Sequence, residues 1–299
     1  MRIPYWRRAL LALMSAVALI TGCAALDEKQ RTLIFQPSDR SWGQSARQAE
    51  GMQDVWIEFH SQVTGQPVRL HGLWHPADAT ASDHACRPLL LFLHGARWNV
   101  RASAGRMRRM QALGFSVLAI DYRGFGQSTA ALPSEAMAVE DARAAWDWLG
   151  RQHPGAARYI FGHSLGGGVA VALAEQVNSE EGVILESTFT SIPDVARTMQ
   201  WGWLPVEPLI TQRFDSGARI GRIGSPVLVV HGARDKTIQP ELGQRLYAAA
   251  AQPKAFILVD KATHNIGASG QAQYRAALPQ VFGTRCFTPA PGQANKSTP

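Results

Sequence analysis

Cysteine and charge are both scarce in this sequence. Three cysteines occur among 299 residues, and charged residues make up 18% of the chain. So few cysteines exclude a small disulfide-rich domain, and the nine histidines show no metal-ligand spacing. The low charge argues against a disordered chain. The formal net charge is +7, of which the arginines at 2, 7 and 8 supply +3; the remaining +4 is a mild excess, and no nucleic-acid-binding motif occurs. We therefore expect no metal, no cofactor and no nucleic-acid partner.

A long hydrophobic run is also missing. The apolar stretch at 9–20 has 12 residues, which is too short to span a bilayer as a helix. Three arginines precede it, and Ile20-Thr21-Gly22-Cys23 follows it. This arrangement resembles a bacterial lipoprotein signal. The resemblance implies that residues 1–22 are a signal peptide and that Cys23 is the lipidated first residue of the mature chain. An ordinary secretory signal with a chance cysteine is the alternative.

The residues after Cys23 bear on location. Ala24 and Ala25 follow it, with no aspartate directly after the cysteine. By resemblance to Gram-negative sorting rules, this favours a lipid anchor in the outer membrane of a bacterial cell envelope, facing the periplasm, over the inner membrane. Several acyl chains anchor better than one, because each buried CH₂ adds about 0.8 kcal/mol. In such an oxidising compartment Cys86 and Cys286 are candidates for a disulfide, with two distant free thiols as the alternative.

Strand and helix patterns alternate along most of the chain. They predict strands at 55–59, 68–74, 88–93, 115–121, 158–161, 183–186, 226–231 and 256–260, and helices at 134–152, 166–176, 241–250 and 271–282. Such alternation predicts an α/β fold, a mostly parallel doubly wound sheet with helices on both faces, and the first two strands add an antiparallel N-terminal edge. We expect this domain at 51–283. A lipidated tether and lead-in segment at 23–50, polar and irregular, precedes it, and a flexible tail at 284–299 follows it.

The stretch FGHSLGGG at 161–168 places a serine between a strand and a run of small residues. Ser164 is the centre of a G-x-S-x-G pattern. A sharp strand-to-helix turn of this kind exposes the hydroxyl, and glycine is needed where strand and helix pass closely. A serine hydroxyl is a weak nucleophile until a base removes its proton. Ser164 is therefore the candidate nucleophile, and a glycine-rich turn with an incidental serine is the alternative.

Two residues downstream of Ser164 fit the roles of acid and base. Doubly wound hydrolases use the chain order Ser, acid, His. Asp235 follows the strand at 226–231, and His264 follows the last strand, so both lie at the C-terminal edge of the sheet. His231, the other downstream histidine, lies at the end of the strand before Asp235. We expect Asp235 to orient His264 and His264 to act as the base. Glu186, at the end of the strand at 183–186, is the rival acid.

Acyl transfer also needs N–H donors for the oxyanion that develops on the substrate. The residue after the nucleophile supplies one donor, here Leu165, and the loop after the strand at 88–93 supplies the other. That loop reads His94-Gly95-Ala96-Arg97. We therefore expect an oxyanion hole formed by the backbone N–H groups of Ala96 and Leu165.

Several segments together resemble the α/β-hydrolase superfamily: LLLFLHGARWN…VLAIDYRG at 89–124, FGHSLGGG, ESTFTSIPD at 186–194, FDS at 214–216, PVLVVHGARDKTI at 226–238 and ATHN at 262–265. The likeness is strongest to its Bem46-like and ABHD13/ABHD17-like branch and covers about residues 50–282. It implies a serine hydrolase that cleaves ester or thioester bonds, fatty acyl (palmitate-like) groups included, through an acyl-serine intermediate. Residues 95–98 read Gly-Ala-Arg-Trp where relatives tend to have Gly-Asn-Ala-Gly. This departure places an arginine and a tryptophan at the entrance to the site.

Two segments and two further functions stay open. Residues 188–225 stand where a cap is usual, and their apolar residues at 201–210 predict either a wall of an acyl pocket or ordinary packing. Five arginines between 97 and 109 would either meet phosphate groups at a membrane surface or form a solvated helix face. An amidase or aminopeptidase would use the same triad, with Glu207 as the candidate for binding an amino terminus. A non-catalytic binding lipoprotein of the envelope is the remaining alternative.

Overall fold

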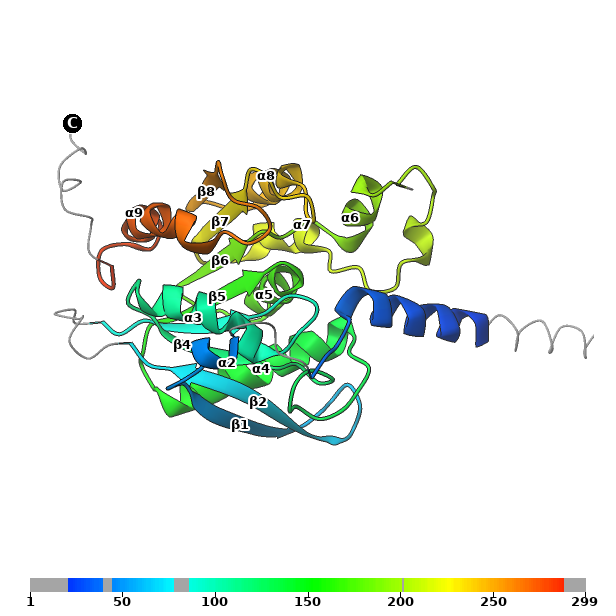
Figure 1. Ribbon diagram of the computed structural model, residues 1–299, viewed down its shortest axis with the longest axis horizontal. Helices are drawn as coiled ribbons and strands as arrows, with labels where there is room; N and C mark the ends of the chain where they lie inside the picture. Colours follow the sequence, from blue (N-terminus) through cyan, green and yellow to red (C-terminus); the bar gives the residue numbers. More distant parts are fainter. Residues whose placement is uncertain (1–20, 40–44, 78–85, 201, 288–299) are drawn as a thin grey trace, which may run out of the picture.

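An eight-stranded sheet forms the centre of the computed structural model, which describes residues 21–39, 45–77, 86–200 and 202–287 (Figure 1). The strands are β1 (Gln53–His60), β2 (Pro67–His75), β3 (Leu89–Leu93), β4 (Ser116–Ile120), β5 (Arg158–His163), β6 (Gly182–Glu186), β7 (Val227–Gly232) and β8 (Lys254–Val259). They lie in the order β1-β2-β4-β3-β5-β6-β7-β8. β2 pairs antiparallel with β1 and with β4, and the other neighbours are parallel. The predicted fold class, with its antiparallel N-terminal edge, is confirmed.

The helices connect these strands. They are α2 (Ser45–Gln48), α3 (Ala104–Gln111), α4 (Glu135–Gln152), α5 (Leu165–Ala174), α6 (Ile192–Thr198), α7 (Ser216–Arg219), α8 (Pro240–Ala249) and α9 (Gln271–Phe282), with short 3₁₀ turns at Val100–Ser103, Glu207–Leu209, Ile220–Arg222 and Gly267–Gly270. The predicted helices correspond to α4, α5, α8 and α9. α4 begins where its periodicity predicts, because the Ser134 side chain accepts a hydrogen bond from the Met137 N–H and caps the helix.

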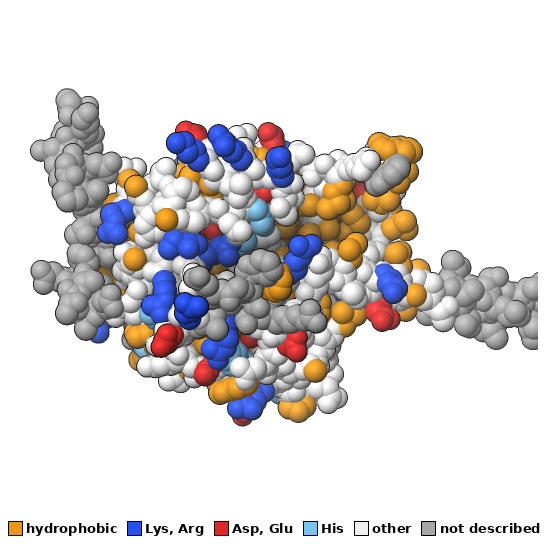
Figure 2. Space-filling model, viewed as in Figure 1, with side chains coloured by type: hydrophobic (Ala, Val, Ile, Leu, Met, Phe, Trp, Pro, Cys, Tyr) orange, Lys and Arg blue, Asp and Glu red, His pale blue; other side chains and the backbone are white. Residues whose placement is uncertain are grey.

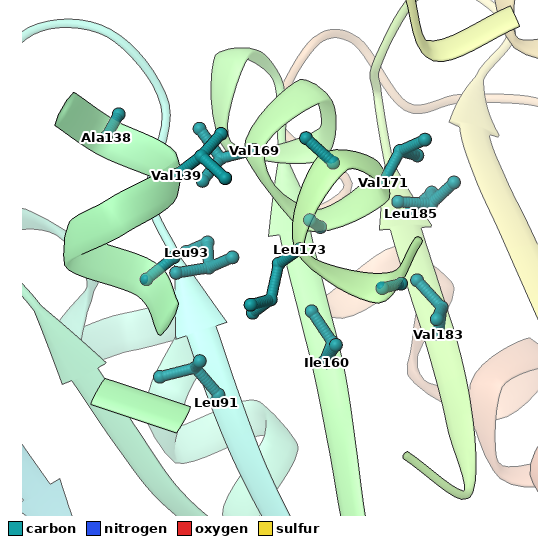
Figure 3. Packing of buried hydrophobic residues seen from close by; sticks show 14 of the residues in the cluster. Leu91, Leu93, Ala138, Val139, Ile160, Val169, Val171, Leu173, Val183 and Leu185 are labelled. Atoms are coloured by element: carbon teal, nitrogen blue, oxygen red, sulfur yellow. The ribbon is translucent and has the colours of Figure 1, made fainter. Parts of the chain in front are cut away.

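Apolar side chains pack on both faces of the sheet. Successive strand residues point to opposite faces, so Leu91 packs beneath α4 and α5 while Leu90 packs beneath the helices of the other face. Figure 3 shows Leu91, Ile160 and Val183, from three neighbouring parallel strands, below the small and branched residues of α5. α3 and α9 contribute Met107 and others to the opposite face. Burial on both faces explains why these strands read as continuous apolar runs.

Residues 21–35 form an N-terminal helix that packs against the domain, so the prediction of an irregular lead-in is wrong for this part of the chain (Figure 1). Asp27 accepts a hydrogen bond of 2.7 Å from the Thr211 hydroxyl, and Gln30 donates one of 2.6 Å to the Leu209 carbonyl. Phe35, at its end, is fully buried in the core. Because polar residues make most of these contacts, the segment lacks the apolar periodicity that predicts a helix. The expected signal peptide lies almost wholly outside the described residues.

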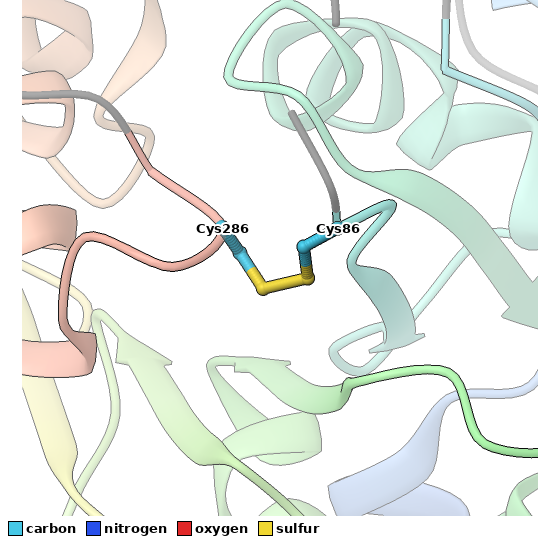
Figure 4. The surroundings of a disulfide bond; sticks show 2 residues. All are labelled: Cys86 and Cys286. Carbon is cyan, nitrogen blue, oxygen red and sulfur yellow. A yellow bond between two sulfur atoms is a disulfide. The ribbon is translucent and has the colours of Figure 1, made fainter. Parts of the chain in front are cut away.

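Cys86 and Cys286 form a disulfide in the structure, with their Cα atoms 5.0 Å apart (Figure 4). The bond joins the segment before β3 to the segment after α9. Phe287, the next residue, is buried and packs its ring against Phe115 and Tyr159. The expected flexible tail at 284–299 is therefore ordered at its start, because these apolar contacts hold it, and residues 288–299 lie outside the described part.

The segment after β6 leaves the body of the protein and returns to it. The Ile192 N–H donates to the Arg213 carbonyl at 2.8 Å and closes the base of this excursion, which we call the cap (residues 192–213). Phe214 returns to the core and packs over Gly168 of α5. The segment that projects from the domain, 192–213, is thus shorter than the expected cap at 188–225, because apolar residues on either side of it are buried in the domain.

Candidate active site

Ser164 stands in a strained turn between β5 and α5. Its φ of 54° and ψ of −122° lie in a region that non-glycine residues rarely adopt. The turn is tight, because a Cβ at Gly166 would collide with the Leu93 and His94 carbonyl oxygens, and one at Gly167 with the Thr188 side chain. The glycines of the motif therefore permit the close passage of helix and strand that lifts the serine hydroxyl above the sheet.

The structure brings Ser164, His264 and Asp235 into one hydrogen-bonded chain. The Nε2 atom of His264 lies 3.0 Å from the Ser164 Oγ, and its Nδ1 atom lies 2.8 Å from the Asp235 Oδ2. These residues are far apart in sequence but follow β5, β8 and β7, whose C-terminal ends meet at one edge of the sheet. The arrangement can pass a proton from a serine hydroxyl to an oriented imidazole.

Asp235 is held as a buried carboxylate. Burial raises its pKa, but hydrogen bonds from His231 and His264 outweigh burial, so the pKa of Asp235 lies well below its usual range. The backbone N–H groups of Thr237 and Ile238 donate to its other oxygen at 2.8 and 3.0 Å. With both oxygens engaged, the carboxylate is fixed in the orientation that His264 requires.

Glu186, the rival acid, faces other partners. Its carboxylate lies 3.2 Å from the Arg106 Nε and accepts a hydrogen bond of 2.7 Å from the Tyr274 hydroxyl. Burial, and then the Glu186 charge, raise the pKa of Tyr274 well above its usual value, so this phenol remains a donor. Asp235, not Glu186, is therefore the carboxylate in contact with His264.

The loop after β3 lies beside the nucleophile. A Cβ at Gly95 would lie 3.1 Å from the Ser164 Cβ, so the backbone of Gly95 passes close to the nucleophile. Ala96 is the next residue of this loop. The His94 ring contacts the Gly95 carbonyl at 2.7 Å, and the Arg97 N–H donates to the Phe35 carbonyl at 2.9 Å. The end of the N-terminal helix is thus hydrogen-bonded to this loop. Leu165 is the first residue of α5, so its N–H has no acceptor within the helix.

Arg106 also lies at this site, in a role that the sequence did not indicate. It contacts Glu186 and the Asn265 side chain, and its Nη2 lies 3.0 Å from the His163 Nε2. The same nitrogen lies 3.2 Å from the His264 carbonyl oxygen, and burial followed by the Arg106 charge lowers the pKa of His163 well below its usual value. Arg106 therefore ties α3 to both neighbours of the triad, because His163 precedes Ser164 and Asn265 follows His264.

The arginines between 97 and 109 do not form one solvated face. Arg97 donates to the Gln36 side chain, Arg101 to Asp54, and Arg108 to backbone carbonyls near residue 50. Arg106 shares a helical stripe with the buried Ser103 and Met110, a spacing that marks it as inward-facing. Within the described ranges, no cluster of three or more His, Cys, Asp or Glu side chains has the arrangement of a metal site.

Comparison with known sequences gives the family. A family model described as "Serine aminopeptidase, S33" matches residues 84–216. The uncharacterised protein Rv2307c of Mycobacterium tuberculosis is 34% identical over 260 residues, which cover 85% of this chain and 88% of that protein. The lysophosphatidylserine lipase ABHD12 of Macaca fascicularis is 32% identical over 205 residues, which cover 62% of this chain and 50% of the lipase. The chain thus matches about half the length of the ABHD12 proteins.

Solved structures show the same fold. The esterase Pf2001 of Pyrococcus furiosus superposes with a TM-score of 0.62 at 19% identity, covering 83% of this chain and 96% of the esterase. A puromycin-hydrolysing peptidase of Mycobacterium tuberculosis superposes with a TM-score of 0.62 at 20% identity, covering 80% of this chain and 40% of the peptidase. These superpositions show the fold. The family-model match and the sequence relatives, with the G-x-S-x-G turn described above, show that the chain belongs to the α/β-hydrolase superfamily and is a serine hydrolase.

Proposed function

We propose that this protein is a lipid-anchored esterase or thioesterase of the bacterial cell envelope that acts through an acyl-serine intermediate. The chain of hydrogen bonds from Ser164 through His264 to Asp235 carries the proposal. It supplies the three groups that an activated serine needs: a nucleophile, a base within 3.0 Å and a carboxylate that orients the base.

In the first half of the reaction, the Ser164 Oγ attacks the acyl carbonyl while His264 takes the hydroxyl proton. The carbonyl oxygen becomes an oxyanion, and the backbone N–H groups of Ala96 and Leu165 stabilise it. One such donor contributes about 3 kcal/mol to the transition state. The intermediate then collapses, and protonated His264 gives its proton to the departing alcohol or thiol.

In the second half, His264 takes a proton from a water molecule, whose oxygen attacks the acyl-serine carbonyl. The carboxylic acid leaves, and Ser164 regains its proton from His264. Asp235 stays ionised throughout and stabilises the imidazolium that forms twice in each cycle. The low pKa of Asp235, which results from its hydrogen bonds to His231 and His264 despite burial, suits this role.

The anchor and the branch are part of the same proposal. The signal-like sequence at 1–23 supports lipidation of Cys23 and attachment to the outer membrane. The motif set at 89–265 supports placement in the Bem46-like branch. Similarity to proteins named as lysophosphatidylserine lipases favours an acyl ester of a lipid as the substrate class. In the described ranges, no helix has the length and apolarity to cross a membrane.

An amidase or aminopeptidase is the second candidate, favoured by the description of the matching family model. An aminopeptidase needs an acidic group that can receive a free amino terminus. Glu207, the candidate in the cap, is already paired with Arg197 and Arg213. Because its carboxylate already has two partners within the cap, the esterase is favoured over the aminopeptidase.

Turnover of p-nitrophenyl esters from acetate to palmitate tests the proposal. The protein used is residues 23–299 with Cys23→Ser, beside the same chain with Ser164→Ala. We expect hydrolysis that Ser164→Ala abolishes, with a preferred acyl length that reports whether the cap contributes an acyl pocket. Amino-acid p-nitroanilides are assayed in parallel. Serine-dependent turnover of the anilides alone would establish the peptidase instead, and a folded chain inert toward both would favour the binding lipoprotein.

A further inference from the structure

Exposed large apolar side chains gather on one face of the molecule. In the described residues nine such side chains are exposed, and seven of them belong to the cap or the N-terminal helix: Leu26, Leu33, Met199, Trp203, Leu204, Val206 and Leu209. We call these seven the cap face. Trp203 is 74% exposed and Leu33 is 72% exposed, so their rings and methyl groups are largely in water. Figure 2 shows apolar side chains concentrated over the cap. Patches of this kind mark interaction surfaces.

Gln30 joins the two segments that carry the cap face. Gln30 donates a hydrogen bond of 2.6 Å to the Leu209 carbonyl and accepts one of 2.9 Å from the Thr211 N–H. Leu26 and Leu33 lie four residues before and three residues after Gln30, so they share its stripe on the helix. By this spacing, the exposed leucines lie on the side of the helix that carries Gln30, the residue that meets the cap.

The same stripe leads to Cys23. It precedes Leu26 by three residues and Gln30 by seven, which is two turns or about 10 Å of helix. The chain before it carries the apolar stretch at 9–20. Acyl chains on Cys23 would thus leave the helix from the side on which Leu26 and Leu33 are exposed. The position of the anchor argues for a lipid bilayer as the partner of this face.

Charge and residue type on the cap agree with a lipid partner. Arg197 pairs with Glu207, and Arg213 pairs with Glu207 and Asp215, so the charges of the cap offset one another. An exposed tryptophan among leucines is typical of the interface between lipid headgroups and acyl chains. The cap follows β6, the neighbour of the strand that leads to Ser164. A bilayer against the cap would therefore face the edge of the sheet that carries the active site.

We propose that the cap face docks on the lipid bilayer in which Cys23 is anchored, and that this contact orients the active site toward membrane-borne acyl substrates. The proposal rests on the anchored esterase described above. A lipid anchor by itself only tethers the protein. The second, apolar contact fixes which side of the enzyme meets the membrane.

Vesicle binding by a chain without acyl groups tests the contact. Residues 23–299 with Cys23→Ser keep the described contacts of Asp27, Gln30 and Phe35. Their sedimentation with vesicles of phosphatidylethanolamine and phosphatidylglycerol is compared with that of a Trp203→Ser/Leu209→Ser variant. A Val63→Ser/Leu258→Ser variant is the matched control, because these residues are 47% and 40% exposed and lie outside the cap face. Circular dichroism and thermal unfolding verify that each variant is folded.

We expect the parent and the control to bind vesicles alike and the cap variant to bind ~10-fold more weakly or worse, since two apolar side chains no longer enter the lipid. Equal binding by the cap variant and the parent, or no binding by the parent, would overturn the proposal. So would a parent dimer that the cap substitutions dissociate, because a second copy would then cover the face. Vesicle binding is measured without a substrate. If only the esterase proposal is wrong, the parent will therefore still bind vesicles but will show no Ser164-dependent turnover.

Discussion

Glu186 is the last residue of β6 and Asp235 lies in the loop after β7, so both are at the edge of the sheet that carries Ser164, and their different partners separate their roles. Asp235→Asn should leave the fold intact and lower kcat by about 10³- to 10⁴-fold, because His264 would lose its orientation and the stabilisation of its charge. Glu186→Gln should instead lower the melting temperature, since Arg106 would lose a buried partner. Ester turnover and thermal unfolding of both variants check this. A fast Asp235→Asn enzyme beside an inactive but folded Glu186→Gln enzyme would reverse the assignment.

Arg106 acts on the triad through its neighbours. Arg106→Gln should lower kcat about tenfold with little change in KM, because small displacements of His264 or Ser164 are costly in rate. Arg108→Gln is the control, since Arg108 lies on the same helix and bonds to backbone carbonyls away from the triad. Kinetics at a temperature where both variants are folded separate positioning from stability. An unchanged kcat in Arg106→Gln would leave Arg106 a purely structural role.

Some residues of the site could be predicted from the sequence and others could not. Ser164 has a local motif, and Asp235 and His264 follow from chain order and strand ends, so all three could be proposed from the sequence and then placed within hydrogen-bonding distance by the fold. Arg106 shares a helical spacing with the buried Ser103 and Met110, but this signal needs α3, which was not predicted, and no local pattern shows that the guanidinium reaches Glu186. Buried ion pairs of this kind depend on distant segments.

At the scale of elements, the strands were the most predictable and the N-terminal helix the least. Parallel strands buried on both faces need continuous apolar runs, and the sequence has them. Asp27 and Gln30 hold the helix at 21–35 against the cap, and such polar contacts produce no periodic pattern of apolar residues in the sequence. Its end supports the loop that contains Ala96, through the Arg97 N–H and the Phe35 carbonyl. A segment expected to be a tether therefore contributes to the site.

The turn between β5 and α5 tolerates little added bulk. Gly166→Ala should destabilise the protein by about 3 kcal/mol, the upper end of the range for overpacking, because the new methyl group would meet backbone oxygens that cannot rotate away. Gly224→Ala is the control, since nothing lies within 4 Å of a Cβ at that position. Urea unfolding of the two variants measures the difference. Equal stability would mean that α5 can shift away from β3 at little cost.

At the scale of the whole molecule, the Cys86–Cys286 disulfide joins segments separated by 200 residues. Its pairing could be suggested from the sequence but not decided, because it depends on α9 returning to the start of β3. Cys286→Ser should lower the free energy of unfolding by about 2–5 kcal/mol. Guanidinium unfolding with and without a reductant checks this. Reduction should destabilise the parent and leave Cys286→Ser unchanged, and a parent indifferent to reduction would show that the bond is not formed.

In our proposals, the anchor at Cys23 and the cap face orient the molecule on a membrane, and Ser164 forms the acyl-enzyme; the second proposal is the more fundamental. The most direct measurement is the intact mass of the folded protein after treatment with an alkyl fluorophosphonate, followed by peptide mapping. We predict a single adduct on Ser164 in the parent, none in Ser164→Ala, and strongly slowed labelling in His264→Ala. A folded parent that acquires no adduct, or one that is labelled at another serine, would contradict it.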